Sequence, residues 1–324
     1  MDPAVARVDR MSCLDATVTE TRFPAMGNTA HVVVVAGDNA TAEHLLSLAR
    51  SWTASLEASW SRFISTSDIY RLNTARGRSV RISPDTEVLV RHLIAAFEAT
   101  DGLFDPFVLP ALLSAGYDTS LAGDGSSSCP AGHRPRDVTR EHVVLESVEG
   151  ETWCRFLDGA TLDPGGLGKG LASDIIAERL ILEGALGALV SMGGDVRCVG
   201  TSPDPAGWVI DIEATSHPSL DNTTIMLSQG AIATSSTHAK RWHSGHHIID
   251  PSTGRPLRED ESTSLRLASV VASTAVWAEV FATASLVAGA EMAGVIVEAR
   301  RLAARFERSD GRPIRTTSFE RFAR

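Results

Sequence analysis

Hydrophobic and polar residues alternate along the first part of the chain in a way that predicts two strands and then two helices. Residues 16–23 and 29–37 look like strands around a short turn at 25–28, a pattern typical of a β-hairpin. Residues 40–60 carry apolar side chains at helical spacing. A second helix is predicted over 83–102, because a Ser-Pro pair begins it and a glycine ends it.

The chain then changes character twice. Residues 104–116 are apolar and interrupted by prolines, which predicts a short buried helix. Residues 118–138 are rich in glycine, serine and proline, so we expect a loop insertion there. No linker divides the chain cleanly. We therefore expect a flexible N-terminal segment at 1–16 and one large domain at 17–324.

The second half of the chain is predicted to be rich in strands. The candidate strands lie at 142–147, 152–157, 187–200 (a hairpin with a glycine turn), 208–214, 224–228, 231–235, 264–273 and within 310–318. Residues 274–306 are predicted to be mostly helical, as two helices broken near Gly289. Helices alternate with antiparallel hairpins, so we expect a mixed α/β (α+β) fold in which antiparallel and mixed sheets are flanked by helices.

Composition narrows the possible partners. The 324 residues are 43% hydrophobic and 22% charged, with a formal net charge of −10. A nucleic-acid-binding protein would normally present a basic face, so nucleic acid is not an expected partner. A single phosphate in a local pocket is compatible with this composition.

Cysteine usage and targeting signals point to a cytoplasmic protein. Cys13, Cys129, Cys154 and Cys198 form no CxxC pair, so neither a zinc site nor a disulfide framework is indicated. The N-terminus lacks an apolar segment of signal-peptide length, and no run approaches the roughly 20 apolar residues of a membrane span. We expect reduced thiols and no membrane span.

The segment 162–176, LDPGGLGKGLASDII, combines an acid, four glycines and a lysine where a strand turns into a helix. Small residues let the backbone approach a ligand, and the helix start offers free N–H groups. Lys169 could add a point charge for a phosphate, and Asp163 could hold a metal, a ribose or an amine. Neither the P-loop nor the dinucleotide fingerprint fits this spacing, so phosphate binding and a plain strand-to-helix turn both stay open.

A histidine-rich segment at 233–256 is a second candidate. It contains Thr234, further small hydroxyl residues and the histidines His238, His243, His246 and His247. A histidine beside a Pro-containing turn can act as a general acid or base near neutral pH. Zinc binding is the competing hypothesis, although no Cys or helical His pair supports it. The third hypothesis is that these histidines are ordinary surface or turn residues.

The segment WAEVFATA at 277–284 places Glu279 and Thr283 four residues apart. On a helix this spacing puts a carboxylate and a hydroxyl on one face. Hard oxygen ligands of this kind suit Mg²⁺, whereas an amphipathic helix with a solvated Glu279 is the alternative. Met26 and Phe63 could pack on a flat ring, or simply in the core. Asp105 follows Phe104 in a turn that needs no functional explanation.

Eight segments, taken in order, resemble those of the ApbE-type FAD:protein FMN transferases. They are AMGNT, SRFISTSDIYRLN, TDGLFDPFVLP, LDPGGLGKGLASD, VSMGGDVRCVG, AIATSS, HHIIDPSTGRP and WAEVFATA, and they cover roughly residues 21–290. The resemblance implies an ApbE-like domain that splits FAD at its pyrophosphate with Mg²⁺. It further implies that AMP is released and that FMN is joined to a Thr or Ser hydroxyl of an acceptor protein.

The resemblance also implies roles for individual residues. Its predicted flavin-nucleotide contacts are Met26, Phe63, Phe104, Asp105, Asp163, Lys169, Thr234, His247 and Ile248. Its predicted Mg²⁺ ligands are the carbonyl of Gly166 and the side chains of Glu279 and Thr283. His247 would take the proton of the incoming hydroxyl, with Asp163 as the second catalytic residue.

The chain departs from the family pattern at two positions. Glu279 stands where the family usually has Asp, and Asn28 stands where it commonly has Thr. Glutamate is one methylene longer, which shifts or weakens a magnesium site. Three alternatives therefore stay open: an FAD pyrophosphatase, a non-catalytic flavin-binding protein, and a related enzyme with another nucleotide substrate.

Overall fold

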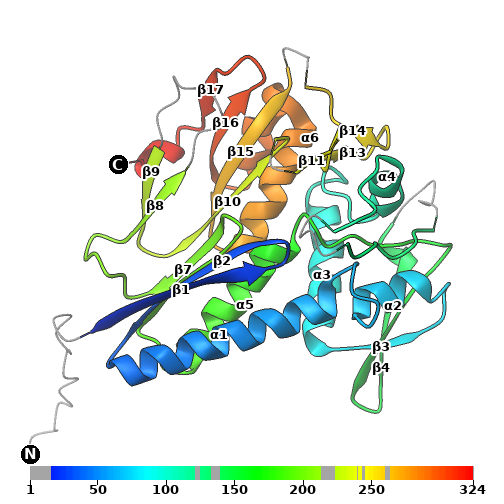
Figure 1. Cartoon of the computed structure of the whole chain (residues 1–324). Coiled ribbons are helices and arrows are strands. Elements are labelled where there is room, and N and C mark those ends of the chain that lie inside the picture. The colour runs from blue at the N-terminus through cyan, green and yellow to red at the C-terminus, as the bar shows by residue number, and fades with distance from the viewer. Residues whose placement is uncertain are drawn as a thin grey trace, which may run out of the picture.

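The centre of the protein is an eight-stranded sheet with the order β1-β2-β6-β7-β10-β15-β16-β17 (Figure 1). The computed structural model describes residues 16–120, 125–132, 139–212, 223–238, 240–242, 245–259 and 263–323. The strands of this sheet are β1 (Thr17–Ala25), β2 (Asn28–Ala36), β6 (Gly187–Met192), β7 (Asp195–Gly200), β10 (Gly230–Ser236), β15 (Leu265–Ala272), β16 (Ala303–Arg308) and β17 (Pro313–Arg315). Every ladder among these residues is antiparallel, so the expected α/β fold with antiparallel sheets is confirmed.

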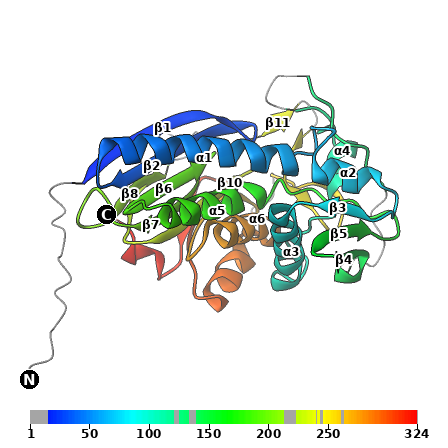
Figure 2. The same ribbon diagram turned by 90° about the horizontal axis from the view of Figure 1, so that it is seen from below.

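The two faces of the sheet are covered differently. Three long helices lie along one face (Figure 2), namely α1 (Asn39–Trp60), α5 (Gly168–Leu182) and α6 (Ala275–Ala299). The hairpin of β8 (Trp208–Ile212) and β9 (Thr223–Leu227) packs its apolar side chains over the other face. Both faces of the central strands are therefore buried, which explains their nearly continuous apolar sequences.

A smaller layer lies at one end of the large sheet (Figure 2). It contains the sheet β3-β5-β4, made of β3 (Val80–Ile82), β5 (Glu151–Phe156) and β4 (Val143–Val148), with α2 (Asp68–Thr74), α3 (Pro84–Ala99) and α4 (Leu109–Ser114). The remaining short elements are β11 (Arg241–Trp242), β12 (Gly245–His246), β13 (Ile249–Asp250), β14 (Arg255–Pro256), η2 (Arg140–His142) and η3 (Phe319–Arg321).

Most of the predicted elements are found where the hydrophobic pattern put them. The hairpin turns at Met26 and Gly27, both with positive φ, and α1, α3 and α4 fall inside the predicted helical segments. Part of the predicted insertion forms a loop pinned by a bridge between Thr119 and Ser127. The expected flexible N-terminal segment lies outside the described residues, except for Ala16.

The predicted helix across 274–306 is wrong at its C-terminal end. Helix α6 ends at Ala299, Arg301 takes a left-handed φ of 59°, and the chain returns as β16. Residues 303–306 are apolar enough for a buried helix or a buried strand. They form a strand because β15 and β17 supply ladder partners on both sides.

Helix α6 is broken at Gly289 as predicted, with φ 76° and ψ 176°. It is long and apolar enough to cross a membrane by length and composition, so the sequence-based expectation that no segment reaches this length needs revision. Its first half nevertheless packs in the core against β10 and β15 and carries the buried Glu279. A core helix passes the same test of length and composition.

Candidate active site

The residues predicted for the site converge on one cavity. This cavity lies between the large sheet with its covering helices and the smaller layer. Its volume is about 290 Å³, near the lower end of small-molecule sites. The predicted residues that line it are Met26, Phe63, Phe104, Asp105, Asp163, Gly166, Lys169, Thr234, His247, Ile248, Glu279 and Thr283. These residues come from segments spread along the whole domain, and the fold alone brings them together.

Two close contacts explain why glycine is needed in the segment 162–176, whose glycine-rich part is called the glycine loop below. A Cβ at Gly166 would lie 3.0 Å from the ring of Phe104, and a Cβ at Gly170 would lie 2.4 Å from the carbonyl oxygen of Ala275. The second contact is where the start of α5 crosses the start of α6. Glycine is required there because any larger residue would push the two helices apart.

Asp174 fixes the start of α6. Its carboxylate accepts hydrogen bonds of 2.8 Å from the backbone N–H groups of Ala275 and Val276, and it lies 3.2 Å from Nε of Arg197. It replaces the side-chain cap that Thr274 does not provide. Burial raises the pKa of Asp174 to about 6, against the lowering effect of these donors. Helix α6 therefore enters the site from a fixed point, one turn before Glu279.

Lys169 is held by two carboxylates. Its ammonium contacts Asp195 at the start of β7 and Glu279 on α6, and the second oxygen of Glu279 accepts the N–H of Gly170 at 2.7 Å. Only 1% of Asp195 and 2% of Glu279 is exposed, which excludes the solvated Glu279 considered from the sequence. Burial alone would lower the pKa of Lys169, but the two carboxylates raise it well above its ordinary value.

Glu279 itself is perturbed by the same cluster. Burial raises its pKa, the negative charge of Asp195 adds to the rise, and Lys169 opposes it. The longer glutamate side chain reaches both the lysine and the backbone of α5. The departure from aspartate therefore ties α6 to the glycine loop.

Adjacent residues of β10 point to opposite faces of the sheet. The hydroxyl of Thr234 lies 2.8 Å from that of Ser269 within the sheet, whereas the hydroxyl of Ser235 lies 3.0 Å from that of Thr283 on α6. Thr234 instead turns its backbone N–H toward Asp195, at 3.3 Å. Thr234, predicted as a contact of the flavin nucleotide, lines the cavity together with Ser235, and the hydroxyl that faces α6 is that of Ser235.

His247 sits on a short loop between β12 and β13. Its backbone N–H donates to the carbonyl of Lys240 at 3.3 Å, and Nδ1 lies 3.3 Å from the same oxygen. A proton on Nδ1 satisfies that carbonyl and leaves Nε2 free to accept one. Burial, together with the nearby charge of Lys240, lowers the pKa of His247 to about 3. The imidazole is therefore neutral near pH 7.

Arg62 and Asp163 organise the opposite wall. Arg62 is 3% exposed and donates from Nη1 to Ser128 Oγ at 2.5 Å and from Nη2 to the carbonyl of Tyr117 at 3.0 Å. Its Nε lies 3.8 Å from Asp163, whose carboxylate also accepts the N–H of Gly165 at 3.0 Å. Ser128 belongs to the predicted insertion, so part of that insertion supports the cavity wall.

Aromatic rings extend this wall. The guanidinium of Arg62 lies 4.3 Å from the centre of the Phe63 ring and 4.4 Å from that of Tyr117. Tyr117 in turn stacks on Trp242, with ring centres 5.3 Å apart and planes 22° apart. Such flat, rigid faces suit a planar ring ligand.

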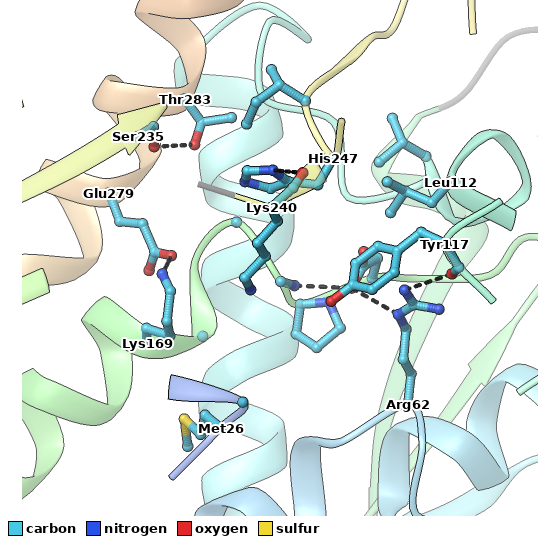
Figure 3. Close-up of a pocket in the computed structure, with 18 of the residues that line it drawn as sticks. Met26, Arg62, Leu112, Tyr117, Lys169, Ser235, Lys240, His247, Glu279 and Thr283 are labelled. Atoms are coloured by element: carbon cyan, nitrogen blue, oxygen red, sulfur yellow. Dashed lines mark hydrogen bonds and ion pairs between the residues drawn. The ribbon is translucent and has the colours of Figure 1, made fainter. Parts of the chain in front are cut away.

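Sequence reasoning missed four residues here, namely Arg62, Tyr117, Asp195 and Lys240. Lys240 lines the cavity, and Figure 3 shows its side chain pointing into it. A compositional signal was available for Lys240. Of the 30 Lys and Arg residues in the chain, two are lysines, Lys169 and Lys240, and both line this cavity. The other three are recognisable only from their contacts.

The donor set distinguishes between the two metal hypotheses. No group of three His, Cys, Asp or Glu side chains able to hold a metal occurs among the described residues, which do not include His243. The zinc hypothesis therefore gains no support. The oxygen donors of Glu279, Thr283 and the Gly166 backbone all line the cavity, and hard donors of this kind fit Mg²⁺ with substrate phosphates.

Comparisons with known proteins identify the family of the chain. The model of the ApbE family matches residues 26–306. A FAD:protein FMN transferase of Vibrio cholerae serotype O1 is 27% identical over 230 residues, 68% of this chain and 66% of the relative. One of Chlamydia trachomatis serovar D is 28% identical over 223 residues, 67% of each chain. The match thus spans about two thirds of the length of these relatives.

The fold agrees as well. The structure is similar to the crystal structure of the Pseudomonas stutzeri flavinyl transferase ApbE in its apo form, with a TM-score of 0.77 and 24% identity over 96% of this chain and 98% of the other. The family match covers most of the domain, including all the segments that build the cavity. The chain therefore belongs to the ApbE family.

Proposed function

We propose that this protein transfers FMN from FAD to a Thr or Ser hydroxyl of an acceptor protein, with Mg²⁺, and releases AMP. The names of its curated relatives support flavin transfer. The observation that carries the proposal is the convergence on one cavity of a neutral imidazole, hard oxygen donors and an aromatic wall. These are the parts needed to accept a proton, bind a metal and bind a flavin ring.

His247 is the proposed base. The acceptor hydroxyl oxygen attacks the phosphorus of the FMN half, the bond from that phosphorus to the AMP oxygen breaks, and the hydroxyl proton moves to Nε2 of His247. The neutral ring is in the proton-accepting form at any pH near 7. The negative charge of bound FAD would raise its pKa and make it a stronger base.

Glu279, Thr283 and the carbonyl of Gly166 would hold Mg²⁺. When bound, the ion would neutralise charge on the pyrophosphate and stabilise the leaving AMP. Before the metal binds, Glu279 holds Lys169 and the N–H of Gly170. Each oxygen of the carboxylate keeps a second lone pair, so Glu279 could bind the metal while it keeps these contacts.

Asp163 is proposed to orient the nucleotide rather than to transfer protons. Its carboxylate accepts the N–H of Gly165 and lies beside Arg62. This arrangement fixes the position of the glycine loop relative to the aromatic wall. Phe63, Phe104 and Met26 complete the apolar surface for the rings of FAD.

The main alternative is hydrolysis, in which water replaces the acceptor hydroxyl and the products are AMP and free FMN. The same base and metal ligands would serve both reactions. The test is to incubate the purified protein with FAD, Mg²⁺ and candidate acceptor proteins. AMP release together with an FMN-sized mass increase on a Thr or Ser residue is expected. AMP with free FMN alone would favour hydrolysis, and bound but unconverted FAD would exclude both enzymatic proposals.

A further inference from the structure

The two lysines of this chain have different environments although both line the same cavity. Every other cationic side chain in the sequence apart from histidine is an arginine. Lysine presents a compact ammonium with three donors on a flexible stem, whereas arginine presents a fixed planar fork. Both lysines line the cavity that is proposed to bind the nucleotide.

The charge of Lys169 is already balanced within the protein. Asp195 and Glu279 both contact its ammonium, and both carboxylates are almost completely buried. Arg62, a cation on the opposite wall of the cavity, lies beside the carboxylate of Asp163. Neither cation therefore needs an external anion.

Lys240 has no such partner. Its backbone carbonyl serves His247, but its ammonium makes no hydrogen bond or ion pair with any residue that the structure describes. The side chain is half-buried and points into the cavity (Figure 3). Burial lowers its pKa, and the charge of Lys169 lowers it further. An unpaired, partly desolvated ammonium is costly, and an anionic ligand would remove that cost.

We propose that Lys240 is the residue that binds the pyrophosphate of the nucleotide substrate, while Lys169 remains with its two carboxylates and organises the metal side of the site. This inference rests on the proposed function for the identity of the substrate. It reverses the assignment suggested by the glycine loop, in which Lys169 alone met the phosphates. The backbone of Lys240 also contacts that of His247, whose N–H donates to the Lys240 carbonyl at 3.3 Å, so phosphate and base are positioned together.

The binding test compares FAD with riboflavin, which has the same ring system but lacks both the pyrophosphate and the adenosine. Lys240→Met should weaken FAD binding by about 10- to 100-fold, the worth of one charge-assisted hydrogen bond, and leave riboflavin binding unchanged. Lys240→Arg should restore most of the FAD affinity. The matched control is Arg241→Met, which removes the same charge from an exposed neighbour paired with Glu259. Equal losses for both flavins, or no loss for FAD, would overturn the assignment.

A second measurement separates this inference from the proposed function. Wild-type protein labelled with carbon-13 at lysine Cε should give one signal for each of the two lysines, and the Lys240→Met spectrum identifies them. Inorganic pyrophosphate should move the Lys240 signal and leave that of Lys169 in place. If no FAD is converted but Lys240 responds, the proposed function fails and the assignment holds. If FAD is converted and pyrophosphate moves only Lys169, the assignment fails and the proposed function holds.

Discussion

The two lysine environments differ in what builds them and in how their charges are balanced. Lys169 lies where α5, α6 and β7 meet, and its ammonium contacts two buried carboxylates. Lys240 lies on the segment that connects β10 to β11 and has no partner in the described part of the chain. The comparison indicates that the charge on the core elements is paired within the protein and stabilises the site. The charge on the connecting segment is left unpaired and is available to a ligand.

The largest expected effect comes from His247, on the loop between β12 and β13 that contacts the backbone of Lys240. His247→Ala should lower the rate of FMN transfer by about 10²- to 10⁴-fold, because it removes the proton acceptor. FAD binding should change little, since most of the predicted flavin-nucleotide contacts lie on other residues. Single-turnover adduct formation and FAD titration measure the two effects separately. His238→Ala, an exposed histidine near the same segment, serves as the control, and full transfer by His247→Ala would remove the base assignment.

The next effect tests the core side of the comparison. Glu279→Ala removes one carboxylate from Lys169 and one proposed Mg²⁺ ligand. The Mg²⁺ concentration that gives half-maximal AMP release should rise by about tenfold or more. The measurement is a metal titration at saturating FAD. Glu291→Ala changes an exposed glutamate of the same helix and should leave the titration curve in place; an unchanged curve for Glu279→Ala would contradict its role as a ligand.

A third change tests whether the close contact between the starts of α5 and α6 stabilises the structure around the site. Gly170→Ala places a Cβ 2.4 Å from the Ala275 carbonyl oxygen, and it should lower the free energy of unfolding by about 1–3 kcal/mol. Gly168→Ala is the matched control, because its nearest neighbour is 3.8 Å away. It should change stability by less than about 1 kcal/mol. Thermal unfolding of both variants checks this, and equal melting temperatures would show that the crossing tolerates the methyl group.

The smallest effect concerns the influence of the Lys240 charge on the pKa of His247. Burial first and the Lys240 charge second lower the pKa of His247. A lowered histidine pKa keeps the base form available down to acidic pH. Lys240→Met removes one lowering cause, so the pKa of His247 should rise and transfer should be lost at a higher pH as the solution is acidified. A pH profile of kcat/KM measures this, with Arg241→Met as control; an acid limb that does not move would contradict the coupling.

Local pattern was enough to predict many elements of the fold. The β1–β2 hairpin, α1, α3 and the break at Gly289 follow from alternation, helical spacing, caps and glycine conformation. The strand β16 did not follow, because its apolar residues fit either structure and only pairing with β15 and β17 decided between them. The sequence also did not show that Ser235 supplies the hydroxyl facing α6, since the orientation of a strand residue depends on which face the helix covers.

The sequence by itself determined which residue types carry the chemistry: the ordered motifs, the glycine loop, His247, Glu279 and the two lysines among many arginines. Only the tertiary structure decided how the charges are distributed among them. A carboxylate neutralises a lysine only when folding brings the two together, and Asp195 and Glu279 reach Lys169 from strands and helices far apart in the chain. Lys240 is left without such a partner, a difference that spacing along the sequence does not encode.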